Sequence, residues 1–379
     1  MNSAVKSVIA CMHDKKLSLN SRGKLRQICK VTKATRCRSE IEQQHLDLWK
    51  RLKKNVSLDF LRAMIEVSGI ESCKYVPEEV HYTRIEPVLN NRSLAHAYND
   101  KNFFERYLTK HANLFPEAVL RVQYGSFYDA DYQQMSLDAA IGLLQRIPYE
   151  HLVLKPSVET GGGSNVAILE KSGSGFMLHG KVVTVREVLS YLERFNSGNS
   201  ILQVRMEQHD WFCRFNQTSL NTLRLYVYRS ITNDEVNPLN GYIRFGRAGS
   251  IVDSSSQGGF TMGVGLSGIT NSFYIGRLGD KHTWEGEKLS LHRALVPNYA
   301  DMVRLAKQIS PYFPHHRLLG FDFAVDSSGK TRLLEVNNLY VGIINQQMSC
   351  GPLFGEYLEE VIEYCMNHKK SYSYHFYRR

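Results

Sequence analysis

The segment from 320 to 338 constrains the fold most strongly, because it combines two strand-like runs with a turn between them. Gly-Phe-Asp-Phe-Ala-Val occupies 320–325, and Thr-Arg-Leu-Leu-Glu-Val-Asn-Asn occupies 331–338. Between them, Asp-Ser-Ser-Gly at 326–329 is a tetrad that favours a tight turn. The sequence therefore predicts a β-hairpin.

The predicted hairpin brings three oxygen donors to one face. With the tetrad as its loop, Asp322 lies opposite Leu333, and alternation of strand side chains places Glu335 and Asn337 on the face of Asp322. Two carboxylates about 4 Å apart repel by roughly 4 kcal/mol at an effective dielectric constant near 20, so a proton or a cation is expected between them. Donors that are all oxygen favour Mg²⁺ or Mn²⁺. The alternative is a solvated hairpin with ordinary acidic residues.

A glycine-rich segment is the second informative feature. In His-Leu-Val-Leu-Lys-Pro-Ser-Val-Glu-Thr-Gly-Gly-Gly-Ser-Asn-Val, residues 151–166, an apolar run ends at Lys155, and three glycines follow at 161–163. Backbone N–H groups can surround a phosphate where no Cβ blocks the approach. The segment is therefore either a nucleotide-binding loop or a plain surface hairpin.

Two common nucleotide-binding motifs are excluded. Gly-Lys at 180–181 is followed by Val182 instead of Ser or Thr, so the P-loop pattern fails. A Gly-x-Gly-x-x-Gly match at Gly263, Gly265 and Gly268 leads into a strand-like run, whereas a dinucleotide-binding loop leads into a helix.

Positive charge is concentrated near the N-terminal end. The chain has a net charge of +10, and residues 15–56 hold thirteen Lys or Arg against Glu40, Glu42 and Asp47, an excess of ten. This segment could meet nucleic acid, anionic lipid or an acidic polymer, or it could be only a solvated helical face. Residues 39–55 have apolar side chains at spacings of three and four, which predicts a helix with one apolar stripe.

Composition limits the class of protein. The 379 residues are 43% hydrophobic, which predicts a soluble globular chain of two or three lobes. No apolar run is long enough to span a membrane. The seven cysteines are an odd number without a Cys-x-x-Cys pair, so we expect neither a disulfide framework nor a zinc cluster. A reducing cytoplasm is the expected location, with peripheral attachment to a membrane as an option.

Strand-like and helical runs alternate after residue 99, which indicates a mixed α/β protein. A short helix is expected at 57–69 and irregular chain at 74–96, and Asn99-Asp100 can cap a helix that reaches about residue 110. The other expected strands are 118–122, 151–154, 166–169, 201–206 and the glycine-rich 241–280, and the other expected helices are 136–146, 184–195, 298–309 and 354–367.

The ordered set of these pieces resembles the ATP-grasp superfamily, most closely its sugar-transfer-associated branch, over about 95–365. The matching pieces are Asn-Asp-Lys (99–101), Val-Leu-Lys-Pro-Ser with the glycines (153–163), Ile-Leu-Gln-Val-Arg-Met-Glu-Gln-His (201–209), Ser-Leu-Asn-Thr-Leu-Arg (219–224), Arg-Phe-Gly (244–246), Gly-Gly (258–259), Asp322 and Glu-x-Asn (335–337). The resemblance implies an α/β (α+β) ATP-grasp fold in which two lobes clasp ATP. The expected divisions are a helical, basic N-terminal region at 1–94, a first lobe with a phosphate lid at 95–200, and a second lobe with the metal-binding hairpin at 201–379.

The resemblance also implies roles for individual residues. ATP phosphates would contact Lys101 and Lys155, under a lid made by Gly161, Gly162 and Gly163. Residues that would border the adenine and ribose are Gln203, Arg205, Met206, Gln208 and His209. The expected catalytic residues are Asn221, Arg224 and Arg244, and the expected Mg²⁺ ligands are Asp322, Glu335 and Asn337. Ser254, Ser255 and Ser256 follow Asp253 where the family usually carries an asparagine.

The expected function is an ATP-dependent carboxylate–amine ligase that forms an acyl phosphate and releases ADP and phosphate. Its partners would be a carboxylate and an amine, small molecules or saccharides, in cell-surface polysaccharide or amino-acid conjugate biosynthesis. A small-molecule kinase with the same nucleotide site is one alternative. The other is a non-enzymatic polyanion-binding protein led by residues 15–56, although nucleic acid is not the expected partner.

Overall fold

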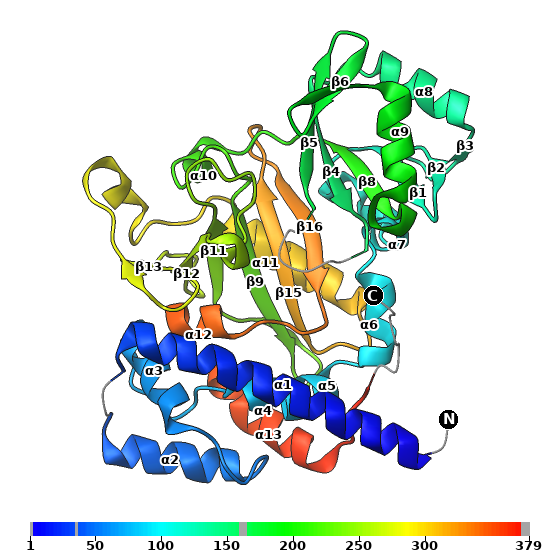
Figure 1. Ribbon diagram of the computed structural model, residues 1–379. Helices are drawn as coiled ribbons and strands as arrows, with labels where there is room; N and C mark the ends of the chain where they lie inside the picture. The colour runs from blue at the N-terminus through cyan, green and yellow to red at the C-terminus, as the bar shows by residue number, and fades with distance from the viewer. Residues whose placement is uncertain (1–2, 35–36, 159–164, 373–379) are drawn as a thin grey trace.

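The computed structural model describes residues 3–34, 37–158 and 165–372. Within them the chain forms two antiparallel β-sheets of eight strands each, together with a helical N-terminal region (Figure 1). The predicted mixed fold and the helical N-terminal region are confirmed. The predicted domain boundaries at 94/95 and 200/201 stay predictions. The second boundary lies within β8 (Ser200–Val204), which is a strand of the first sheet.

The first sheet has the strand order β3-β2-β1-β8-β4-β5-β6-β7. Its core lies between the strands and helices α8 (Leu137–Arg146) and α9 (Val185–Arg194), which lie beside each other in Figure 1. α9 begins with a capping box, in which the Thr184 hydroxyl and the Glu187 carboxylate each accept from the other residue's backbone N–H. The remaining strands are β1 (Ala118–Gln123), β2 (Ser126–Tyr128), β3 (Gln134–Met135), β4 (His151–Pro156), β5 (Ala167–Ser172), β6 (Gly175–Leu178) and β7 (Lys181–Thr184).

The second sheet has the order β14-β13-β12-β11-β9-β15-β16, with β10 paired to β9. Strand β15 (Leu318–Val325) is buried along its whole length because both faces of the sheet are covered. One face packs against α11 (Tyr299–Ile309), and the other packs against α13 (Leu358–Asn367) and the N-terminal region. The other strands are β9 (Thr222–Arg229), β10 (Val236–Pro238), β11 (Gly241–Phe245), β12 (Phe260–Val264), β13 (Tyr274–Ile275), β14 (Lys281–His282) and β16 (Thr331–Asn337).

The predicted hairpin is β15 and β16, but its predicted register is wrong. Asp322 lies opposite Glu335, and Phe323 lies opposite Leu333, so Leu334 is an extra residue on β16. This β-bulge shifts the pairing beyond it, which alternation alone does not reveal. The bulge places the two carboxylate-bearing residues directly opposite each other.

The N-terminal region consists of α1 (Ser3–Thr32), α2 (Ser39–Lys50) and α3 (Leu58–Ser68). α1 lies across α3 and the helices near residue 80 (Figure 1). It also reaches distant parts of the chain. The His13 Nε2 atom lies 2.8 Å from the Tyr340 hydroxyl oxygen, and the Asp14 carboxylate contacts the Lys370 ammonium at 2.6 Å.

The expectation of irregular chain at 74–96 is wrong. This part contains α4 (Glu78–Val80), the π-helical η1 (His81–Ile85), α5 (Glu86–Leu89) and α6 (Arg92–Tyr98). Pro87 lies in the first turn of α5, where its missing N–H is not needed, and the Asn91 side chain caps α6 by accepting from the Ser93 N–H at 3.1 Å. Residues that suggested loops therefore mark helix starts.

Short helices connect these units. They are α7 (Lys101–Tyr107), η2 (Thr109–Leu114), η3 (Phe195–Gly198), α10 (Asp210–Cys213), η4 (Ser255–Gln257), η5 (Gly286–Leu291), η6 (Ser310–Tyr312), α12 (Ile344–Cys350) and η7 (Gly355–Tyr357). All seven cysteines are free thiols. A search of the described helices found none whose length and apolar character would allow it to cross a bilayer.

Candidate functional site

Neighbouring strands of the second sheet align charged side chains in one row. Asp322 on β15 lies opposite Glu335 on β16 and opposite Arg224 on β9, and Arg224 lies opposite Tyr242 on β11. Residues directly opposite each other in antiparallel strands share a face of the sheet. Arg244, two residues along β11, therefore projects from the same face.

Asp322 is the centre of this row. Its two carboxylate oxygens accept from Nε and Nη2 of Arg224, each at 2.6 Å, and Nη2 of Arg244 lies 2.9 Å from Oδ2. Burial alone would raise the pKa of Asp322, but the two guanidinium groups outweigh it and lower that pKa. The carboxylate is therefore ionised and is held in a planar, two-pronged contact.

Arg244 connects Asp322 to a second buried carboxylate. Its Nε lies 3.2 Å from Oδ2 of Asp253 and donates to the Thr222 hydroxyl at 3.0 Å, while that hydroxyl donates to Asp253. Burial raises the pKa of Asp253 despite the adjacent Arg244. Two arginines and two carboxylates thus alternate along this face.

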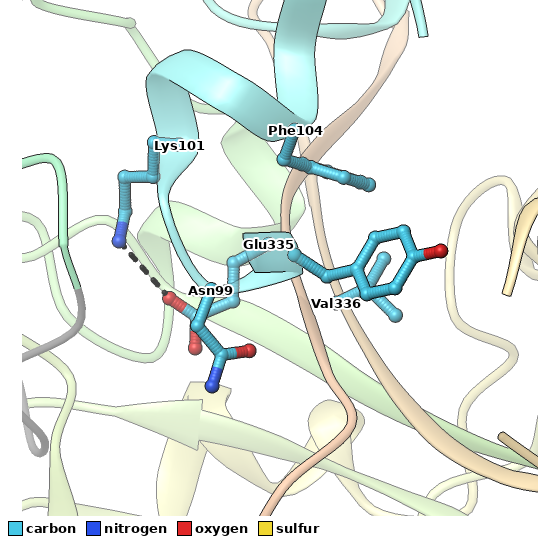
Figure 2. Close-up of a pocket in the computed structure, with 6 residues that line it drawn as sticks. Asn99, Lys101, Phe104, Glu335 and Val336 are labelled. Carbon is cyan, nitrogen blue, oxygen red and sulfur yellow. Dashed lines mark ion pairs between the residues drawn. The ribbon is translucent and has the colours of Figure 1, made fainter. Parts of the chain in front are cut away.

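The two predicted phosphate-binding lysines lie close enough for their charges to interact, one on a strand of the first sheet and one on the helix α7. Lys155 lies on β4, and Lys101 is the first residue of α7. The backbone N–H of Lys101 donates to the Ser157 carbonyl at 2.8 Å, which joins the start of α7 to the end of β4. The Lys101 ammonium lies 3.6 Å from Oε2 of Glu335, an ion pair between the two sheets (Figure 2).

Lys155 belongs to a chain of hydrogen bonds that runs into the first sheet. Its ammonium donates to Oε1 of Gln203 at 3.2 Å, and the Gln203 amide donates to Oε1 of Glu105 at 3.2 Å. Glu105 is paired with Arg121 at 2.7 Å. Burial, followed by the repulsion from Lys101, lowers the pKa of Lys155 to about 8. A small anion could relieve this repulsion by binding between the two lysines.

A small pocket opens beside these groups. It is lined by Tyr98, Asn99, Lys101, Phe104, Glu335 and Val336. Figure 2 shows Lys101 pointing toward Glu335 from one wall, with Phe104 and Val336 forming an apolar side. The pocket therefore combines one cation, one anion and an apolar surface at the junction of the two sheets.

The segment 205–209 connects the two sheets. The Arg205 N–H donates to the His151 carbonyl in the first sheet at 3.1 Å, and the His209 N–H donates to the Val325 carbonyl in the second at 2.9 Å. The Arg205 side chain is exposed, and Met206 is half-buried. The His209 ring accepts from the Trp211 N–H at 3.1 Å and caps α10. Their predicted contacts with the adenine and ribose stay predictions.

Gln208 and Asn221 are buried or half-buried residues that hydrogen-bond to each other. The Gln208 amide donates to the carbonyls of Asn216 and Ser219, at 2.8 and 2.9 Å, and its oxygen accepts from the Asn221 backbone and side chain. The Asn221 amide also donates to the Phe212 carbonyl at 2.9 Å. Their catalytic and ribose-binding roles stay predictions, because these contacts hold the loop before β9 together.

The predicted metal ligands form a set of oxygens of the kind that Mg²⁺ and Mn²⁺ prefer. Asn337 donates through Nδ2 to the Gly320 carbonyl at 3.2 Å, which leaves its oxygen as an acceptor. Glu335 is 30% exposed, and its contacts to Lys101 and Arg224 are long, at 3.6 and 3.8 Å. Glu335 and Asn337 therefore have oxygens available for a divalent cation, whereas both oxygens of Asp322 already accept from Arg224 and one also contacts Arg244. Across the described residues, no group of three or more His, Cys, Asp or Glu side chains could hold a metal by itself.

The structure thus brings seven of the sixteen predicted residues together at one place. Lys101, Lys155, Arg224, Arg244 and the hairpin residues converge at the junction of the sheets, whereas Asn221 lies in the loop before β9. Gly161, Gly162 and Gly163 lie outside the described residues.

Sequence reasoning missed Glu105 and Arg121, which support Lys155 from behind. Both are less than a tenth exposed, and their side chains pair at 2.7 Å. Two signals point to them. Glu105 follows Lys101 by one helical turn, and Arg121 interrupts an apolar strand. A lone charge in an apolar strand implies a buried partner.

Comparisons with known proteins identify a family. The sequence model of the family described as "Sugar-transfer associated ATP-grasp" matches residues 81–362, which is more than half of the chain. Among curated proteins, no significant match was found.

Several solved structures are similar at low sequence identity. D-alanine–D-alanine ligase from Bacillus anthracis complexed with ATP is 10% identical, with 72% of this chain and 65% of that chain covered and a TM-score of 0.38. N5-carboxyaminoimidazole synthetase from Staphylococcus aureus complexed with ADP is 9% identical, with 66% and 47% covered and a TM-score of 0.38. L-amino acid ligase from Bacillus licheniformis is 11% identical, with 71% and 52% covered and a TM-score of 0.37. The chain spans less than two thirds of the length of each of these proteins.

Proposed function

Because this chain belongs to the sugar-transfer-associated ATP-grasp family, we propose that it is an ATP-dependent ligase that joins a carboxylate to an amine. The nucleotide would bind at the junction of the two sheets. ADP and phosphate would be the released products. The two organic substrates would be small molecules or saccharides, and we assign them only by these functional groups.

One observation supports the proposal: Lys155 of the first sheet and Lys101 of α7 lie beside the row of acidic and basic side chains on the second sheet. The Lys101–Glu335 ion pair, 3.6 Å long, is the direct contact between them. Lys155 lies near enough to Lys101 for their charges to repel. Arg224 lies 3.8 Å from Glu335, and Arg244 pairs with the neighbouring Asp322. A nucleotide triphosphate needs such an arrangement, because its phosphates carry several negative charges that must be offset before another anion can approach.

Each group has a separate task in this proposal. Lys101 and Lys155 would bind phosphate oxygens as compact point charges on flexible stems. Arg224 and Arg244, fixed by Asp322 and Asp253, would hold the incoming carboxylate in line with the terminal phosphate through planar contacts. The apolar wall formed by Phe104 and Val336 would exclude water from the reactive intermediate.

The proposed reaction has two bond exchanges. A carboxylate oxygen forms a bond to the γ-phosphorus as the bond to ADP breaks, which gives an acyl phosphate. The amine nitrogen then forms a bond to the acyl carbon and loses a proton, while phosphate leaves with one of the original carboxylate oxygens. This route makes phosphate the leaving group in place of oxide or hydroxide, and it predicts where that oxygen goes.

A divalent cation fits the same place. Glu335, Asn337 and Asp322 would hold Mg²⁺ or Mn²⁺, which when bound would neutralise charge on the terminal phosphates. For Asp322 this requires sharing its oxygens with Arg224 and Arg244, whereas Glu335 and Asn337 each have acceptor capacity left. A titration of Mn²⁺ into the wild-type protein and Glu335→Gln, followed by electron paramagnetic resonance, would report binding without any turnover.

The test of the proposed reaction is a screen for ADP release across pairs of carboxylates and amines, with oxygen-18 in the carboxylate of any hit. We expect one oxygen-18 atom in the released phosphate for each amide bond formed. If the acceptor keeps the phosphoryl group, the protein is a kinase and the ligase proposal is wrong. If folded protein releases no nucleoside diphosphate with any substrate pair or any nucleoside triphosphate, the enzymatic proposal fails as a whole.

A further inference from the structure

Helix α1 leaves four apolar side chains on the side that faces away from the protein. Val5, Val8, Met12 and Leu19 are between 46% and 66% exposed. Steps of three, four and seven residues separate them, so they lie on one face of the helix. The opposite face contains the buried Ile28 and packs against the N-terminal core. Soluble proteins seldom leave such a stripe exposed to water without a partner.

Four cationic side chains continue the same face. Lys15, Lys16, Arg26 and Lys30 are exposed at helical spacing on this face. The first two lie between Met12 and Leu19, and the last two follow Leu19 and Gly23. In the part of the chain that the structure describes, none of these four side chains has an ion pair or a hydrogen bond. We call these eight apolar and cationic residues the outer face of α1; Figure 1 shows the helix lying across the surface of the N-terminal region.

The cations at the edge of α1 differ from those on its outer face. The Arg22 guanidinium lies 3.2 Å from Glu79, and the Lys24 ammonium lies 3.3 Å from Glu78. Both glutamates are buried residues of α4, one of the helices that α1 contacts. The charges at the edge of α1 are therefore paired with glutamates of the same chain, and those of the outer face are left for another partner.

We propose that the outer face of α1 binds a membrane surface that contains anionic lipids, with the helix lying in the plane of the interface. The four cations would meet lipid phosphates and carboxylates, and the four apolar side chains would enter the acyl boundary. A nucleic acid would use the cations but would leave the apolar stripe in water. A second copy of the same face would bring like charges together. A lipid surface is the partner that satisfies both kinds of side chain, and this proposal is independent of the proposed reaction.

The test is sedimentation of the full chain with vesicles of phosphatidylcholine alone and of phosphatidylcholine mixed with phosphatidylserine. We expect binding to the mixed vesicles only. Each Lys or Arg near an anionic surface contributes about fivefold to the partition coefficient, so K15Q/K16Q/R26Q/K30Q should weaken binding by at least about a hundredfold. The matched control is K110Q/R146Q/K181Q/R194Q, which removes the same charge from exposed positions elsewhere and should bind like the wild type.

A second variant separates a membrane from other polyanions. V8S/M12S/L19S keeps every charge, so it should retain binding to heparin or duplex DNA but should lose the part of vesicle binding that survives high salt. Circular dichroism and thermal unfolding of each variant check that the fold is intact, which we expect because none of these side chains is buried.

Four results would overturn the proposal. One is that the wild-type protein fails to sediment with phosphatidylserine vesicles. Another is that the outer-face charge variant and its control bind these vesicles equally well. Alternatively, the V8S/M12S/L19S variant binds vesicles like the wild type at high salt, which would leave only a general polyanion site. A concentration-dependent dimer that this variant abolishes would instead assign the face to a second copy of the chain.

Discussion

The depressed pKa of Lys155 makes a quantitative prediction about nucleotide affinity. Burial and the neighbouring Lys101 lower the pKa of Lys155 to about 8, so this lysine is about 90% charged at pH 7 and about 10% charged at pH 9. Only the charged form is expected to bind phosphate. The dissociation constant for ADP should therefore rise by about tenfold between pH 7 and pH 9, because binding must take up a proton.

The assay is isothermal titration calorimetry with ADP and Mg²⁺ at several pH values. Phosphate groups of this kind are fully ionised above pH 7, so they add no further dependence in this range. Repeating the titration in buffers with different ionisation enthalpies should reveal uptake of a proton near pH 9 and little uptake at pH 7. Both readouts measure binding alone and require no knowledge of the organic substrates.

Lys155→Arg is the control, because a guanidinium stays charged over the whole range. A poorer geometry would weaken ADP binding by the same factor at every pH. The dissociation constant of this variant should therefore stay constant between pH 7 and pH 9. The reasoning is refuted if wild-type affinity is flat, or if Lys155→Arg shows the same slope as the wild type.

Three further predictions concern stability and turnover. Lys155→Met should raise the free energy of unfolding at pH 7 by about 2 kcal/mol. The fall in the pKa from 10.5 to about 8 destabilises the folded state by roughly 3 kcal/mol, and loss of the hydrogen bond to Gln203 offsets about 1 kcal/mol of the gain. Wild-type stability should accordingly rise between pH 8 and 10.5, and urea unfolding should show the gain of Lys155→Met vanishing there. Arg121→Met should cost about 3–5 kcal/mol in urea unfolding by leaving Glu105 buried and unpaired, and Arg121→Met/Glu105→Leu should recover most of that cost. Glu335→Gln should lower ADP formation by about a hundredfold or more with unchanged thermal unfolding, whereas Glu193→Gln at an exposed position should leave both unchanged.

Alternation along two short strands was enough to predict the centre of the site. Asp322, Glu335 and Asn337 lie near one another on one face of the hairpin because side chains alternate in any extended strand. The exact pairing could not be predicted, since the bulge at Leu334 depends on how the hairpin fits into the larger sheet. Pattern thus determined the face, and tertiary packing determined the register.

Local sequence patterns could not predict the contacts between segments that are far apart in the chain. The sequence did not predict that the Gln203 side chain links Lys155 to Glu105, which lies 98 residues before Gln203 in the chain. The prolines and asparagines between 74 and 96 were interpreted as loop residues, although the same residue types also begin helices. Both outcomes depend on which neighbours surround a residue once the chain is folded.

The contacts of α1 have a consequence for the order in which the protein is assembled. This helix is synthesised long before two of its partners, because Asp14 pairs with Lys370 and His13 meets Tyr340, more than 300 residues later. A nascent chain can dock α1 on α3 and α4, but these two contacts can form only after residues 340 and 370 have left the ribosome. Stalled chains that end before residue 340 should therefore leave α1 open to a protease that the finished protein resists.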